Sequence, residues 1–282
     1  MYSEELKVVA DSLNALPAEQ KDNSADWIMH HVLDSKYLDF EPFFKIYLPE
    51  IHLFGIDFSI TKHVVFLWIA AAILLVIFHF VGKQYKKSFL PKGLANTMEM
   101  LVIFVRDEIA KPTIGKGYEK FLPYLLTVFF FILVCNFLGL IPYGATATSN
   151  ISITAALATM TFFVVQAGGI MKNGPIGYFK GLIPGGVPGW LLPIMFVVEI
   201  LGLFTKPFAL AVRLFANLTA GHIVIYALIG LIFILQTFFV APVSVAFALF
   251  IYLLEILVAL IQAYIFTMLS SLFIGMAVHQ DH

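Results

Sequence analysis

The sequence predicts an all-α polytopic membrane protein with a polar N-terminal segment (residues 1–61) and a membrane domain (residues 62–282). Hydrophobic residues make up 60% of the 282 residues and charged residues only 12%, whereas an average soluble domain is about 25% charged. The mean hydropathy is +0.92. Only seven of the 17 basic and 18 acidic side chains lie after residue 120. A soluble fold of this size could not keep so much apolar surface away from water.

Composition also excludes several function classes. The net charge of -1 and the lack of a Lys/Arg-rich run argue against nucleic acid as a partner. Cys135 is the single cysteine, so neither a disulfide framework nor a cysteine metal site is expected. We interpret His30 and His31 as surface residues, and we expect no metal and no cofactor. The first twenty residues contain no apolar stretch typical of a cleavable secretory signal.

The N-terminal segment and the first crossing differ sharply in charge. Residues 1–61 carry eleven acids and four lysines, and we expect them on the outer side of the membrane. The first crossing is predicted over residues 62–82, which is about the length that one bilayer crossing requires. Lys83, Lys86 and Lys87 follow this crossing, so the positive-inside rule places its end in the cytoplasm.

Residues 93–111 are predicted to form an amphipathic helix that lies in the membrane interface instead of crossing it. Apolar residues recur there at helical spacing, while Glu99, Arg106 and Lys111 share the other side. The same periodicity also fits a soluble helix packed on its own domain, and that alternative stays open.

A helical hairpin follows, with crossings predicted over residues 118–143 and 150–172. The loop between them has no Lys or Arg, whereas Lys172 and Lys180 follow the second crossing. The loop is therefore expected outside and Lys172 inside. Six glycines and three prolines between residues 173 and 189 predict a linker.

Two unusually long apolar stretches end the chain, at residues 190–236 and 239–279. The first would measure about 70 Å as one helix, well over a bilayer crossing. Each stretch is therefore either a pair of short spans or one long, steeply inclined helix. The total is five or seven crossings, and both odd numbers place the N-terminus outside and the C-terminus inside.

Ionisable residues inside these stretches are candidates for function, because a charge in lipid is costly and is retained where it faces a cavity or a partner. Glu199, Lys206 and Arg213 are seven residues apart, and Asn217 lies one turn beyond Arg213. All four therefore share one polar stripe of a helix. A lysine near the end of a span commonly extends to the interface, so a structural role is favoured for Lys206.

The last stretch carries a matching polar face, with Glu255 and Gln262 seven residues apart. If the two stretches are antiparallel neighbours, residues at one depth have a constant sum of residue numbers. Arg213 is then level with Gln262, and His222 is level with Glu255. His222 lies nine residues from Arg213 and so belongs to the opposite face of its helix.

Arg213 is expected to take its counter-charge from another subunit. Arginine stays charged in proteins and passes no proton itself. No carboxylate of this chain lies at its depth, and Glu255 is offset by about 10 Å along the helix. An internal ion pair of Arg213 with Glu255 or Glu199, holding the helices together, is the alternative.

The segment KPFALAVRLFANLTAGH has an arginine, an asparagine four residues later and a glycine eight residues later. It resembles the signature of subunit a of the F-type ATP synthase membrane sector. LLEILVALIQAYIF resembles the last helix of that family, NFLGLIP and TATSNISITAALA its middle helices, and ITKHV its first crossing. The resemblance runs from about residue 60 to the C-terminus. It implies five transmembrane helices plus one interfacial amphipathic helix, the last two long and strongly inclined against a rotating ring of c subunits.

The resemblance also implies roles for individual residues. Arg213 corresponds to the essential arginine that faces the ring carboxylate, with Gln262 beside it. His222 and Glu255 correspond to two positions of the outer half-channel, interchanged relative to many bacterial members in a way also seen in mitochondrial members. Glu199 corresponds to an acidic position of the inner half-channel.

The implied function is proton translocation. A proton enters from outside past Glu255, His222 and Asn217, neutralises a ring carboxylate that has left Arg213, and leaves near Glu199. No catalytic site is expected in this chain, because ATP forms elsewhere in the complex. Protons are favoured over sodium because the path contains histidine. The implied partners are the c-subunit ring, the subunit b peripheral stalk, the remainder of the ATP synthase and the lipid bilayer of a bacterial inner membrane.

Two other classes of function are possible for a polytopic chain. A secondary transporter could use Arg213 as an anion-substrate site, but it would show repeated halves, and no internal repeat is visible. An intramembrane serine protease could use Ser270 or Ser271 with His279, but nothing in the pattern arranges a base beside a nucleophile.

Overall fold

The computed structural model describes residues 35, 37–40, 44–49, 52–53, 56–57, 59–86, 92–141, 144, 146–181, 191–235 and 239–279. Most of the predicted polar segment, including His30 and His31, lies outside these residues. Its described part forms two short antiparallel hairpins, in which β1 (Tyr37–Phe40) pairs with β2 (Phe44–Tyr47) and β3 (His52–Leu53) pairs with β4 (Ile56–Asp57). From Lys62 onward, the described regular structure is helical.

Five helices are long and apolar enough to cross a membrane. They are α3 (Lys62–Tyr85), α6 (Leu122–Leu140), α7 (Ile151–Asn173), α9 (Leu192–Leu235) and α10 (Val240–Val278). The predicted all-α polytopic membrane fold is therefore confirmed. Each of the last two apolar stretches forms one continuous helix, as the five-crossing alternative requires.

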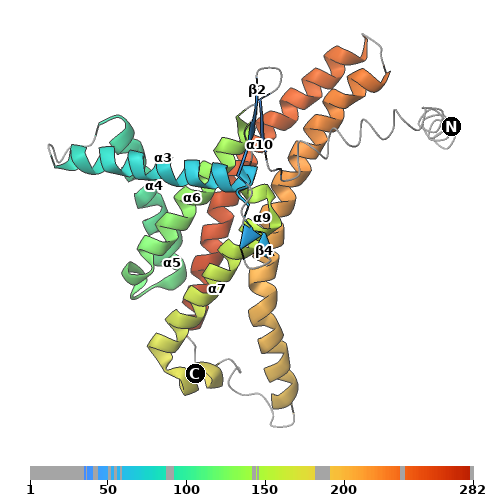
Figure 1. The fold of residues 1–282 in the computed structure, drawn as a ribbon. Coiled ribbons are helices and arrows are strands. Elements are labelled where there is room, and N and C mark those ends of the chain that lie inside the picture. Colours follow the sequence, from blue (N-terminus) through green and yellow to red (C-terminus); the bar gives the residue numbers. More distant parts are fainter. Residues whose placement is uncertain are drawn as a thin grey trace.

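The lengths of α9 and α10 dictate their inclination. With 44 and 39 residues, they measure about 66 Å and 58 Å, against a hydrocarbon core of about 30 Å. Helices that cross once at such lengths must lie steeply inclined in the bilayer. The two helices run antiparallel and side by side, and their connected ends project beyond the other helices, while α3 lies crosswise to them (Figure 1).

The core is formed where the C-terminal half of α10 packs against α6, α7 and α9. Leu125 and Ile132 of α6, Leu214 of α9 and Phe266 and Ile274 of α10 are almost completely buried there. Buried hydroxyl groups on these helices bond to carbonyls of their own helix, which satisfies polar atoms that lipid could not. These are Thr161, Thr267 and Ser270.

A helical run occupies the place of the predicted amphipathic helix. It comprises α4 (Leu94–Phe104), the π-helical turn η1 (Val105–Ala110) and α5 (Lys111–Ile114). The apolar side of the run faces the core, where Val105, Ile109 and Ile114 are buried. Its packing on α6 and α10 fixes this side toward the membrane helices.

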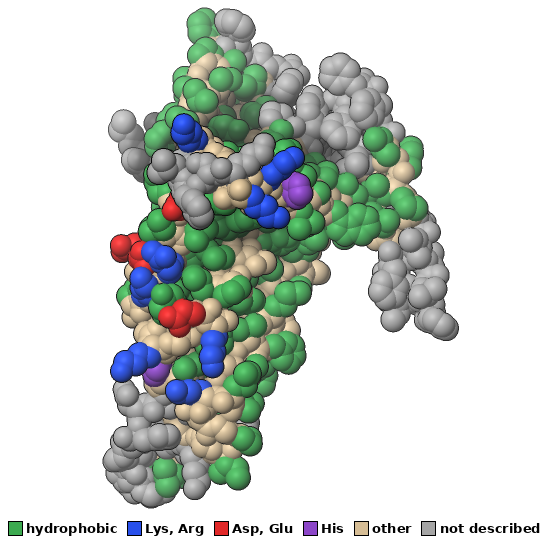
Figure 2. All heavy atoms as spheres, turned by 90° about the vertical axis from the view of Figure 1, so that its left-hand side faces the viewer, with side chains coloured by type: hydrophobic (Ala, Val, Ile, Leu, Met, Phe, Trp, Pro, Cys, Tyr) green, Lys and Arg blue, Asp and Glu red, His purple; other side chains and the backbone are tan. Residues whose placement is uncertain are grey.

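The other side of this run carries its charges. Arg106 pairs with Asp107 at 2.9 Å, and Lys111 pairs with the same carboxylate at 2.5 Å. The hydrogen bond from Arg106 and the one from Lys111 hold the pKa of the Asp107 carboxyl well below its usual range. On the face of the molecule that includes these helices, charged side chains gather toward one side and hydrophobic side chains cover much of the rest (Figure 2).

Gly275 allows α10 to approach this run closely. A Cβ atom at position 275 would overlap the backbone carbonyl of Thr113, and the Thr113 hydroxyl contacts Ser271 at 2.5 Å. We expect Gly275→Val to separate α5 from α10 and to destabilise the membrane domain by about 1–3 kcal/mol, as overpacking does in other cores. The effect is measured by heating the purified complex and recording the temperature at which this subunit is lost from it.

Gly82 provides the matched control, because a Cβ atom on this residue of α3 would meet nothing within 4 Å. Gly82→Ala should leave the unfolding temperature unchanged. Equal stability of Gly275→Val and Gly82→Ala would show that the close approach of α5 and α10 is not needed.

Candidate functional site

Arg213 stands on the exposed side of α9 without a partner among the residues that the structure describes. Among the described residues, it makes no ion pair and no hydrogen bond, and neither Glu199 nor Glu255 contacts it. The side chains of Phe204 and Phe208, which precede it on α9, are more than half exposed. An always-charged group therefore faces outward from an apolar helix surface.

A hydrogen bond joins α9 to α10 one turn beyond Arg213. The Asn217 amide Nδ2 donates to Oε1 of Gln262 at 3.0 Å, and Gln262 is almost completely buried. The expected register placed Gln262 level with Arg213, so the observed pairing is offset by one helical turn. The arginine remains adjacent to this amide pair because Asn217 lies four residues further along α9.

The structure brings His222 and Glu255 together, as the antiparallel arrangement predicts. Nδ1 of His222 lies 3.8 Å from Oε1 of Glu255, whose side chain is buried. Neither carboxyl oxygen of Glu255 has a hydrogen-bond partner among the described residues. The carboxyl group packs directly on the backbone of Gly221, where any Cβ atom would overlap it.

The histidine also contacts a residue that the sequence did not single out. Nε2 of His222 lies 2.8 Å from the hydroxyl oxygen of Thr146, just before the short helix η3 (Ala147–Ser149) in the loop between α6 and α7. Thr148 of η3 donates to Asn136 at 2.7 Å, and Asn136 donates to the Ala259 carbonyl of α10 at 3.2 Å. The loop is thus anchored to two helices and holds its hydroxyl against the imidazole. The run TATSN, polar in an apolar context, was the available signal.

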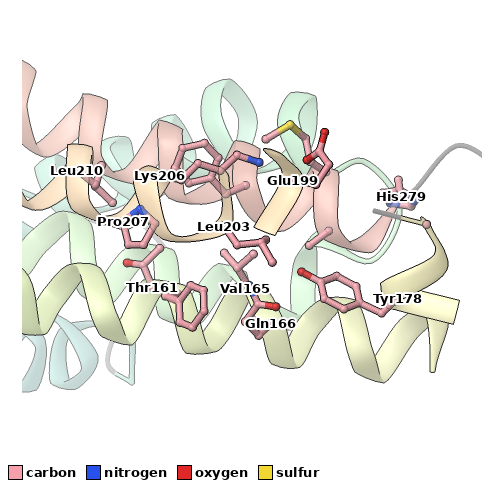
Figure 3. Close-up of a pocket in the computed structure, with 15 residues that line it drawn as sticks. Thr161, Val165, Gln166, Tyr178, Glu199, Leu203, Lys206, Pro207, Leu210 and His279 are labelled. Carbon is pink, nitrogen blue, oxygen red and sulfur yellow. The ribbon is translucent and has the colours of Figure 1, made fainter. Parts of the chain in front are cut away.

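A second polar site lies near the other end of α9. It is a pocket of about 300 Å³ between α7, α8 (Pro175–Gly181), α9 and α10. Glu199 and Lys206 project into it from α9, and Gln166 and Tyr178 face them from α7 and α8 (Figure 3). The Gln166 amide nitrogen is buried and has no hydrogen-bond partner among the described residues.

Lys206 is held by an aromatic ring instead of a carboxylate. Its Nζ lies 5.6 Å from the centroid of the Phe273 ring, which is within the range of a cation–π interaction. Within the described part of the chain, no ion pair joins it to Glu199. Of the predicted polar stripe, Glu199 and Lys206 line the pocket, whereas Arg213 and Asn217 do not.

Arg213 lies between the two polar sites along α9. Glu199 lies about 21 Å before Arg213, and His222 lies about 14 Å after it, along the helix axis. Such an arrangement offers titratable groups at each end and a permanent cation between them.

The residues of the protease alternative do not form a catalytic pair. The Ser270 hydroxyl donates to the Phe266 carbonyl at 2.7 Å, and the Ser271 hydroxyl contacts Thr113. His279 lines the pocket near Glu199. No hydrogen bond joins either serine to His279 where the structure describes them, so the nucleophile lacks its base.

Comparisons with known proteins agree with the resemblance. A family described as ATP synthase A chain matches residues 64–275. ATP synthase subunit a of Chloroherpeton thalassium is 62% identical over 258 residues, which are 90% of this chain and 77% of that protein. The corresponding subunit of Pelodictyon phaeoclathratiforme is 55% identical over 280 residues, 97% of this chain and 82% of that protein. The corresponding subunit of Myxococcus xanthus is 55% identical over 234 residues, which are 80% of this chain and 77% of that protein. The chain therefore belongs to the ATP synthase A chain family, which comprises subunit a of the F-type ATP synthase.

Proposed function

We propose that this chain forms two offset proton half-channels against the rotating c-ring, with Arg213 between them. In this role it couples proton flow across the membrane to rotation and ATP synthesis. The observation that carries the proposal is the position of Arg213, which is exposed, unpaired among the described residues and flanked along α9 by two polar sites. Members of the family translocate protons as a membrane subunit, and the complex as a whole makes ATP.

The exposed guanidinium requires an anion from outside the chain. A charged side chain in the middle of a membrane costs about 2.5–3.5 kcal/mol by insertion measurements. A carboxylate on a ring subunit facing this side of α9 would neutralise it. Once such a carboxylate is protonated, Arg213 no longer attracts it, and the neutral site can move into lipid at lower cost. The arginine thereby blocks direct proton leakage and makes rotation depend on proton binding.

His222 and Glu255 are proposed to form the outer half-channel. Histidine exchanges protons near neutral pH, and the carboxyl group of Glu255 is not held by a guanidinium or a backbone amide in the described residues. A proton taken up by this pair would continue past Asn217 and Gln262, whose hydrogen bond lies next to Arg213.

The pocket around Glu199 is proposed to form the inner half-channel. It lies toward the N-terminal end of α9 and the C-terminal end of α10, which the positive-inside rule places on the cytoplasmic side. This assigns the N-terminus to the outer side. A potential of 100 mV then supplies about 2.3 kcal/mol for each proton that crosses.

The proposed partners follow from the same geometry. The c-ring covers the exposed side of α9, while the subunit b peripheral stalk and the remainder of the ATP synthase hold this subunit against rotation in a bacterial inner membrane. A secondary transporter would place Arg213 in a substrate pocket, but Arg213 does not line the pocket around Glu199. No observation favours that alternative.

Replacing Arg213 with alanine should abolish ATP-driven proton pumping, because the ring carboxylate loses the cation that captures it. Pumping by inverted membrane vesicles, followed with a pH-sensitive dye, measures this loss. Arg106→Ala is the matched control, since Arg106 is paired with Asp107 away from the proposed ring surface. Pumping that survives in Arg213→Ala at the level of the control would contradict the proposed mechanism.

Replacing Glu255 with glutamine should slow proton entry while preserving assembly, because glutamine has nearly the same size but does not exchange a proton. ATP synthesis by the reconstituted complex under an imposed potential measures the entry rate. Glu99→Gln removes a partly exposed acid that accepts a hydrogen bond from Tyr85, and it should retain the wild-type rate. A wild-type rate in Glu255→Gln would remove Glu255 from the path.

The pocket should be open to water from the cytoplasmic side. In a Cys135→Ser background, a cysteine replacing Leu203, which lines the pocket, should react with a membrane-impermeant maleimide added to inverted vesicles. The reaction requires a thiolate, which forms in water and not in lipid. Leu201→Cys, on the exposed apolar side of α9, should stay unlabelled. Labelling of Leu203→Cys only from the opposite side would reverse the proposed orientation.

A further inference from the structure

A second buried histidine lies close to the proposed outer half-channel. His63, in the first turn of α3, is only 3% exposed. Its Nε2 lies 3.3 Å from the hydroxyl oxygen of Ser149 in η3. Buried polar contacts therefore link α3 to Ser149 of η3, and Thr146, which precedes η3, links this turn to His222 on α9.

The hydrogen bonds define the direction of this chain. The Ser149 hydroxyl donates its single proton to the Thr146 carbonyl at 2.7 Å. Because that proton is used, Ser149 accepts from His63, and the imidazole of His63 carries a proton on Nε2. The other ring nitrogen of a neutral imidazole is then the basic one, which can bind a further proton.

Thr146 is the common partner of the two histidine sites. Its carbonyl accepts from Ser149, and its hydroxyl lies 2.8 Å from Nε2 of His222. Close packing fixes its place, because a Cβ atom on Gly139 of α6 would overlap the Thr146 side chain. Thr219 of α9 also donates to the Ser149 carbonyl at 3.5 Å.

We propose that His63 is a further proton-binding group of the outer half-channel, one step outward from His222 and connected to it through Ser149 and Thr146. This inference rests on the proposed function of His222 and Glu255. It adds a titratable group on α3, whereas the half-channel proposed above uses only α9 and α10.

The proton balance of the step is simple. One proton binds to the basic nitrogen of His63, and the Nε2 proton passes to Ser149. The Ser149 hydroxyl turns from the Thr146 carbonyl to the Thr146 hydroxyl, which gives its own proton to Nε2 of His222. His222 releases its Nδ1 proton to Glu255. His63, Ser149, Thr146 and His222 each gain and lose one proton, and the carboxylate of Glu255 gains one to become a carboxyl group.

Within the described residues, the titratable and charged groups near these contacts come from α3, α9 and α10. Lys62 precedes His63 on α3 and lies close enough to His222 for their charges to interact. His222 and Tyr226 are the titratable groups from α9, and Glu255 is the one from α10. The helices α6 and η3 contain no Asp, Glu, Lys, Arg or His. In the described part of the chain, the two imidazoles thus lie between Lys62 on α3 and Glu255 on α10.

His63→Gln tests the inference, because the glutamine amide can still donate to Ser149 but does not titrate. The whole complex is reconstituted in liposomes whose lumen faces the outer half-channel, and ATP synthesis is driven by a potassium diffusion potential. When the pH of the lumen is varied between 5 and 8, the rate should fall about tenfold at the alkaline end and little at the acid end. When protons are scarce in the lumen, the rate of synthesis depends most on the group that takes them up.

Ser149→Ala should show the same pH-dependent loss, because it interrupts the chain but keeps both histidines. Thr159→Ala is its control, since the Thr159 hydroxyl bonds only to the Ala155 carbonyl of its own helix. The inference would be overturned if His63→Gln synthesised ATP at the wild-type rate at every pH. It would also be overturned if the rate of this variant were reduced by the same factor at every pH. The second result would show a structural role.

Arg213→Ala in the same liposomes separates this inference from the proposed function. If Arg213→Ala abolishes synthesis while His63→Gln matches wild type, only the role of His63 is wrong. If Arg213→Ala retains synthesis, the proposed half-channels themselves are wrong. Co-purification of the ring with each variant shows that the complex has assembled.

Discussion

An arginine that has no counter-charge among the described residues and faces outward from an apolar helix is the constraint on which the proposed function depends. Its charge is permanent, so an anion in the membrane must meet it. An anion on a fixed neighbour would form a static ion pair, whereas an anion on a moving neighbour gives an interaction that is made and broken. The exposure of Arg213 and the polar sites on both sides of it along α9 suit the second case.

The length of α9 turns this local constraint into a path. A helix that crossed the bilayer upright would place Glu199 and His222 about 35 Å apart along the membrane normal. A steeply inclined helix instead spreads part of this separation along the membrane plane, so that the two polar sites are displaced sideways as well as in depth. Sideways displacement is what a rotating partner needs, since a site that takes up a proton at one position must travel before it releases it.

Sequence reasoning succeeded where periodicity and charge decide the structure. The uneven charges predicted the polytopic helical fold, and spacings along two antiparallel helices predicted that His222 and Glu255 meet. The register of Gln262 differed by one turn, because a constant sum of residue numbers assumes straight helices in even contact. Thr146, Gln166 and Tyr178 were missed, because a loop or a neighbouring helix brings them to the sites and local spacing does not encode such tertiary contacts.

The interchange of histidine and acid that the family resemblance implies is compatible with the geometry of the helix pair. Proton exchange requires that the two groups meet at one depth, and antiparallel helices satisfy this whichever helix carries which group. The surroundings are less symmetric. Glu255 needs the space that Gly221 leaves on α9, and His222 needs the hydroxyl that Thr146 holds against it. We therefore expect that an exchange of the acid and the histidine between α9 and α10 would also require changes at Gly221 and Thr146.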